Sequence, residues 1–302
     1  MPASSINFGY LPEALELRVG KVEITTLPDL EGTVHAIKSQ FSVDGAWLYS
    51  PLQTVHNLGG TTRTAPYPAR VFGLPKTHSF AHDDGATPEH VAFHLWSLSF
   101  FQGMRLTQLA AGFLDATPIE TEKLHDFILY NDGIEHSIAL AEAFWNAHQG
   151  TKATSLFGSA VHSLFLAQYP KALEFERFVY YYTSLDACFA LAKELHGLTS
   201  RTHGERIGEM CDFFGIPKPD WADAKASSAN ALVATIRNAT LHEAIFMDQP
   251  LGFATTKAGI ELNLTLQMQA LVCRLLVALI GARGADYVRT PINTRQRHML
   301  RL

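Results

Sequence analysis

The stretch HDDGATPEH, residues 82–90, marks the point at which the sequence pattern of the chain changes. Upstream, from about Leu15, short runs rich in β-branched and aromatic residues alternate between apolar and polar positions, which is typical of strands: LELRVGKVEITTL, TVHAIKSQFSV, AWLYSPL and ARVFGL. Inside the stretch, Thr87 is suited to cap a helix and Pro88 to occupy its first position. The sequence therefore predicts a small β-rich domain over residues 1–86.

Downstream of this stretch, apolar residues recur with helical spacing between glycines and prolines. The predicted helices cover residues 88–107, 120–148, 155–168, 171–197, 203–214, 226–244 and 260–282. Residues 261–283 are the most apolar part of the chain but contain Asn263, Gln267, Gln269 and Arg274, whereas a membrane span needs about 20 largely apolar residues. We expect a buried core helix there, and an α+β protein whose β-rich domain precedes an all-α domain over residues 87–302.

Composition narrows the classes of function. A chain of 302 residues suits two domains, and 47% hydrophobic with 18% charged residues is typical of a globular soluble protein. The net charge of −5 argues against coating nucleic acid by bulk attraction but permits a local basic site. The three cysteines lie far apart, and we find no signal peptide, Walker loop or serine-hydrolase elbow. We expect a cytoplasmic protein without a cofactor.

The segment TIRNATLHEAIF, residues 235–246, places Arg237, Asn238 and His242 together. Residues five apart on an ideal helix differ by about 140° at roughly 100° per residue, so Arg237 and His242 converge only at a helix end, at a kink or across two chains. A structural alternative stays open: Arg237 could pair with Glu243 or another acid, and His242 could satisfy a helix-terminal carbonyl.

The RNATLH segment resembles the Arg-polar-x-x-x-His signature of HEPN domains. It precedes a long final helix and follows FERFVYYYTSLDACFALAKEL, which resembles the Y-x-x-L-E helix of the family with Asp186 at the acidic position. The resemblance covers about residues 155–302. It implies a homodimer in phage defence or a toxin system that cleaves single-stranded or tRNA-like RNA without a metal. The resemblance also implies a phage-derived or nucleotide trigger, and no membrane partner is expected.

The same resemblance implies a role for each residue. His242 would act as acid and base, because imidazole exchanges protons near neutrality. Arg237 would stabilise charge on the phosphate, with Asn238 donating to phosphate or holding a neighbour. Asp186 and Glu243 would support them, and the product would end in a 2′,3′-cyclic phosphate.

The basic tail YVRTPINTRQRHMLRL, residues 287–302, offers Arg295 and Arg297 as candidate substrate-binding residues. The alternative is a frayed, solvated end.

Two other classes of function remain open: a catalytically inactive HEPN-like dimer that binds RNA or nucleotide or scaffolds a partner, and a sensor whose β-rich domain binds a ligand. His90 and His94 have a spacing that can place two imidazoles on one metal ion, but no third ligand is identifiable from the sequence. We therefore expect these histidines to be structural and predict no metal.

Overall fold

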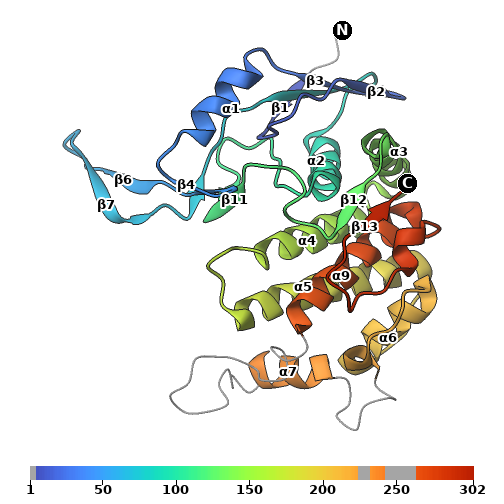
Figure 1. Ribbon diagram of the computed structural model, residues 1–302. Coiled ribbons are helices and arrows are strands. Elements are labelled where there is room, and N and C mark those ends of the chain that lie inside the picture. The colour runs from blue at the N-terminus through green and yellow to red at the C-terminus, as the bar shows by residue number, and fades with distance from the viewer. Residues whose placement is uncertain (1–4, 224–231, 242–262) are drawn as a thin grey trace. The chain divides into compact units, whose positions relative to one another are not determined.

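The computed structural model describes residues 5–223, 232–241 and 263–302, so His242 and Glu243 lie outside the described residues. The chain divides into two compact units, Met1–Lys123 and Leu124–Leu302. Strands dominate the first unit and helices the second, as the α+β prediction requires (Figure 1).

The first unit is built on a four-stranded antiparallel sheet with the order β1-β9-β3-β2. Its strands are β1 (Ile6–Phe8), β2 (Leu17–Val19), β3 (Val22–Thr26) and β9 (His78–His82). In the β2–β3 turn, the backbone of Gly20 has a φ angle of 57°, which residues other than glycine rarely adopt. Phe8, Ile24 and Phe80 are at most 1% exposed, so the sheet carries an apolar core.

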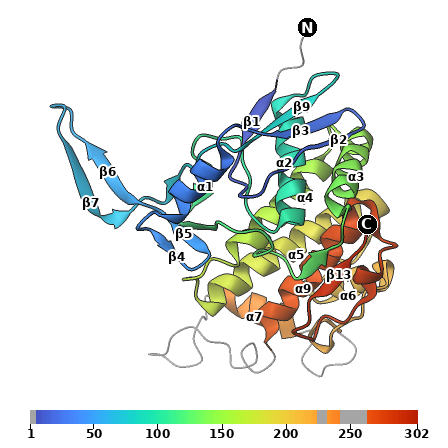
Figure 2. The same cartoon turned by 45° about the horizontal axis from the view of Figure 1, so that its top comes forward.

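Smaller sheets complete this unit. One contains β11 (Ala116–Pro118), β5 (Trp47–Tyr49) and β4 (Val43–Asp44), and another pairs β10 (Phe113–Leu114) with β8 (Val71–Phe72). The hairpin of β6 (Leu52–His56) and β7 (Thr62–Pro68) extends away from the rest of the unit (Figure 2).

One predicted strand is a helix. The run TVHAIKSQFSV was expected to be extended, but α1 covers Leu30–Lys38. Leu30, Thr33, Val34 and Ile37 are its shielded positions, and this spacing follows the helical period. Glu31 in the first turn and Lys38 in the last also favour a helix by complementing its dipole.

Helix α2 (Pro88–Gln102) begins as predicted, because the Thr87 hydroxyl accepts a hydrogen bond from the His90 backbone at 3.2 Å. It ends earlier than expected, at Gly103 with φ 62°. The helix packs on β9, where the rings of Phe80 and His94 lie 5.2 Å apart. The first compact unit therefore continues to Lys123, beyond the predicted boundary at residue 86.

The second unit consists mainly of helices. They are α3 (Gly133–His148), α4 (Lys152–Leu166), α5 (Glu174–His196), α6 (His203–Phe214), α7 (Leu232–Leu241) and α9 (Leu264–Val277), with short helical turns at Asp220–Ala222, Ala278–Ala282 and Asp286–Arg289. Helices α4, α5 and α9 pack side by side (Figures 1 and 2).

Two expectations for this unit are wrong. The helix predicted over 120–148 begins only at Gly133, because Phe127–Leu129 form strand β12. The C-terminal tail is not frayed at this strand: His298–Leu300 form β13, which pairs in parallel with β12. A strand of three residues is too short to show a recognisable period in the sequence.

The apolar segment near the C-terminus is a core helix, as expected. By length and composition Leu264–Ala282 could cross a membrane, but 72% of its most apolar window is buried in the protein. A helix that is apolar on most sides is stable in water when neighbouring helices cover it.

Arg274 of α9 is the most deeply buried charged side chain among the described residues, with 1% of its side chain exposed. Its guanidinium donates to Asp126 Oδ2 at 2.8 Å, to the Thr290 hydroxyl at 2.8 Å and to the Pro291 carbonyl at 3.0 Å. The Tyr287 hydroxyl donates to the other oxygen of Asp126. This network connects α9 to the two segments that lead into β12 and β13.

We expect Arg274→Ala to lower the free energy of unfolding by about 3–5 kcal/mol, because it leaves the Asp126 carboxylate without its buried counter-charge. Chemical denaturation measures this loss. The exposed Arg289→Ala serves as a control and should change stability by less than about 0.5 kcal/mol. Equal stability of the two variants would contradict a structural role for the network.

Candidate functional site

Helix α5 presents two polar side chains on one face. Tyr182 and Asp186 are four residues apart and therefore neighbours along the helix. The Tyr182 hydroxyl lies 2.6 Å from Nδ1 of His203, and Asp186 Oδ1 lies 3.0 Å from Nη1 of Arg206 and 3.5 Å from Nδ1 of His203. Two residues of α6 thus meet this face of α5.

The loop between α5 and α6 places His203 and Arg206 against this face of α5. Helix α5 ends at Gly197 with φ 72°, and the Glu209 carboxylate then accepts the backbone N–H groups of Thr199 and Ser200 at 3.0 and 2.9 Å. The anchored loop starts α6 at His203, so that His203 and Arg206 occupy its first turn. The Arg206 guanidinium also lies 5.1 Å from the ring of Phe189 on α5.

The surroundings of Tyr182 keep its hydroxyl protonated. Burial and the Asp186 carboxylate raise the pKa of Tyr182, while the Arg237 and Arg206 charges oppose the rise without cancelling it. The phenol therefore keeps its proton and can donate it to His203. Nη1 of Arg206 lies 3.1 Å from Nδ1 and 3.4 Å from Nε2 of His203, so the guanidinium sits beside the imidazole ring.

Arg237 and Asn238 lie on α7, whose Val233, Ala234 and Ile236 are buried. Nη1 of Arg237 donates to Oδ1 of Asn238 at 3.0 Å. The charge of Arg237 also acts on the Tyr182 hydroxyl, as its effect on the pKa of that group indicates. The charge of Arg237 thus falls within electrostatic range of this face of α5, while α7 itself packs against α6 and the turn Asp220–Ala222.

We call Tyr182, Asp186, His203, Arg206 and Arg237 the α5–α6–α7 cluster. It holds two arginines against one aspartate, and the side chains of Asp186, His203 and Arg206 are 35%, 28% and 25% exposed. A partly exposed site with an excess of positive charge, guanidinium groups and an imidazole can bind an anion such as phosphate.

The other predicted site residues are placed as follows. Arg297 donates to the Phe127 carbonyl at 2.6 Å, which gives it a structural role beside β12. Arg295 is exposed and lies 3.4 Å from the side-chain oxygen of Asn263. His242 and Glu243 fall outside the described residues, so their predicted roles stay predictions.

Sequence reasoning did not single out His203 or Arg206, since no motif surrounds them. Of the three consecutive tyrosines on α5, Tyr181 and Tyr182 are 2% and 3% exposed, and Tyr180 is 36% exposed.

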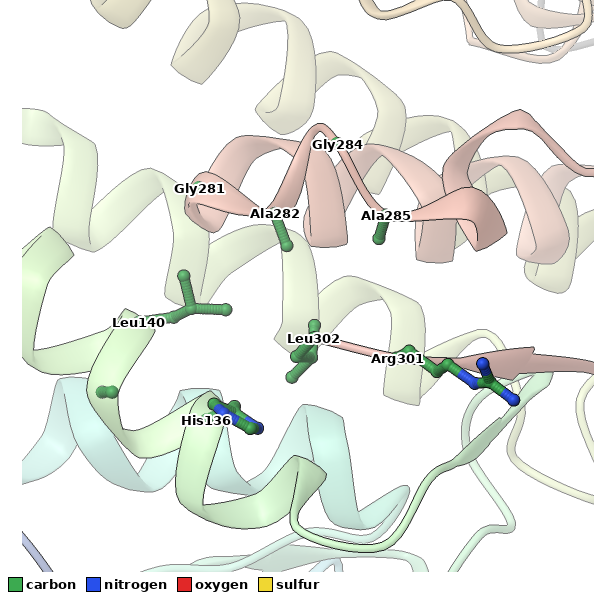
Figure 3. Close-up of a pocket in the computed structure, with 9 residues that line it drawn as sticks. His136, Leu140, Gly281, Ala282, Gly284, Ala285, Arg301 and Leu302 are labelled. Carbon is green, nitrogen blue, oxygen red and sulfur yellow. The ribbon is translucent and has the colours of Figure 1, made fainter.

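A cavity of about 540 Å³ lies elsewhere in the second unit. Figure 3 shows His136 and Leu140 of α3 across from Ala282 and Ala285. Its walls are mostly small and apolar, and its Arg301 lies over the ring of Tyr130 at 4.7 Å. None of the residues that line the cavity belongs to the α5–α6–α7 cluster, so the cavity is not part of that site.

No family model, no curated protein and no solved structure matches the chain.

Removal of the Tyr182 hydroxyl tests the cluster as a structural unit. We expect Tyr182→Phe to lower the free energy of unfolding by about 1 kcal/mol, because it deletes a buried hydrogen bond to His203. Tyr180→Phe, on the exposed side of the same helix, is the matched control and should have an effect near zero. Urea denaturation compares the two, and a larger loss for Tyr180→Phe would contradict this geometry.

Proposed function

We propose that the protein is a metal-independent endoribonuclease of the HEPN type, with Arg237, Asn238 and His242 at its active site. The observation that carries the proposal is the face of α5 on which Asp186 pairs with Arg206 at 3.0 Å beside His203, within electrostatic range of Arg237. The sequence of α5 and the RNATLH segment each resemble the family, and the two resemblances are independent. A second arginine, Arg206, adds to the positive charge there.

The chemistry fits the residue types. In this reaction a base removes the proton of the RNA 2′-hydroxyl, the 2′-oxygen attacks phosphorus, and the bond to the 5′-oxygen breaks as an acid protonates that oxygen. His242 is the proposed acid–base residue. Arg237 and Arg206 are the groups proposed to stabilise the negative charge that builds up on the phosphate oxygens.

The wider setting belongs to the same proposal. We propose a cytoplasmic homodimer in phage defence or a toxin system, where pairing of two chains places two copies of Arg237 and His242 in one cleft. Arg295 and Arg297 are proposed to contact the RNA backbone. The rival function, an inactive dimer that binds RNA or nucleotide or scaffolds a partner, shares the site but not the reaction.

The experiment compares purified wild type, His242→Ala and Arg237→Ala on total RNA in EDTA. We expect wild type to cleave without metal and to leave 2′,3′-cyclic phosphate ends. Each variant should be slower by about 10²–10⁴-fold, because it lacks the acid–base group or the charge that stabilises the transition state.

Arg63→Ala, on the exposed hairpin strand β7, is the matched control and should retain wild-type cleavage. Folding and oligomeric state are checked by circular dichroism and sedimentation. Absence of cleavage by wild type, or equal cleavage by all four proteins, would contradict the proposed reaction. RNA binding without cleavage would support the inactive rival.

A further inference from the structure

Three buried histidines gather in the first unit, away from the α5–α6–α7 cluster. His82 ends strand β9, and His90 and His94 lie on α2. His82, His90 and His94 are 5%, 6% and 1% exposed. The ring centroids of His82 and His90 are 5.0 Å apart, and those of His90 and His94 are also 5.0 Å apart.

These distances match those of imidazoles that share one metal ion. With a metal–nitrogen distance of about 2.0–2.1 Å and tetrahedral angles, the centroids of two coordinating rings lie roughly 5 Å apart. The possible ligand atoms of His82 and His90 lie within 4.8 Å of each other, whereas His94 falls outside that group and would have to turn its ring toward them to complete the site. His90 and His94 are four residues apart on one helix face, a spacing that lets two histidines bind the same ion.

We propose that His82, His90 and His94 form a three-histidine site for a divalent transition-metal ion such as Zn²⁺. The fold supplies the third ligand that the sequence could not identify, because the short connection between β9 and α2 folds back and leaves the ring of His82 5.0 Å from that of His90 in the first turn of α2. Neutral imidazole is a preferred ligand of zinc, copper and nickel, whereas Mg²⁺ and Ca²⁺ prefer oxygen.

A local contact holds one of the ligands in place. Thr87 caps α2 through the His90 backbone N–H at 3.2 Å, which holds the first turn in place. Nδ1 of His82 accepts the backbone N–H of Asp84 at 3.2 Å, so this nitrogen is unprotonated. A metal ion at Nδ1 would replace this long hydrogen bond, and the amide of the exposed Asp84 could then bind water. The bound ion would connect β9 to α2.

The test is a titration of the full-length protein, freed of metal by chelator, with Co²⁺ alone and then with Zn²⁺ as competitor. We expect saturable binding of one Co²⁺ per chain with the visible absorption of a nitrogen-ligated ion, and its displacement by Zn²⁺. Zn²⁺ should also raise the thermal unfolding temperature, because it binds the folded site.

His82→Gln, His90→Gln and His94→Gln should each weaken Co²⁺ binding by about tenfold or more. His78→Gln is the matched control, since His78 lies on the same strand and is fully buried. It should bind like wild type.

The wild-type titration decides the matter even if a variant fails to fold. Absence of stoichiometric binding by wild type overturns the proposal, and so does wild-type affinity in any of the three glutamine variants. These readouts do not involve RNA, so they are independent of the proposed ribonuclease activity.

Discussion

The second unit depends on the rule that a buried charge needs a counter-charge. Arg274 lies on a core helix with only 1% of its side chain exposed, and Asp126 compensates its charge from a segment distant in sequence. Because this pair also engages Thr290 and Pro291, it fixes where the C-terminal segment returns to the helices. The β12–β13 pairing follows from that return.

The same rule separates the structural charges from those available for function. Arg274 is itself almost fully buried and bonds to Asp126, Thr290 and Pro291, and its role is to hold these segments together. The α5–α6–α7 cluster also pairs an arginine with an aspartate, but a quarter to a third of its side-chain surface remains exposed. Groups that are held rigidly and still reach solvent can exchange water for an anionic ligand, which is why we place the proposed function there.

The sequence predicts a strand-rich part followed by a helical part, the start of α2 after Thr87 and the burial of α9, since each depends on local pattern and capping. It does not predict α1, because TVHAIKSQFSV is rich in β-branched residues and its helical face becomes evident only in the folded unit. Nor does it predict β12, His203 or Arg206. Their positions depend on contacts between segments that no short motif encodes. His82 is close to His90 in sequence, but the contact of its ring with the His90–His94 pair becomes evident only in the folded unit.

The most direct test of the central claim, that the α5–α6–α7 cluster is the site for RNA phosphate, is a nuclear magnetic resonance titration of the imidazole signals. The ligand is a 2′-O-methyl RNA oligonucleotide, which cannot be cleaved through its 2′-oxygen, and His203→Gln assigns the signal of His203. Our account predicts a saturable shift of that signal as the oligonucleotide binds. Binding that leaves the His203 signal unchanged, or no binding at all, would contradict it.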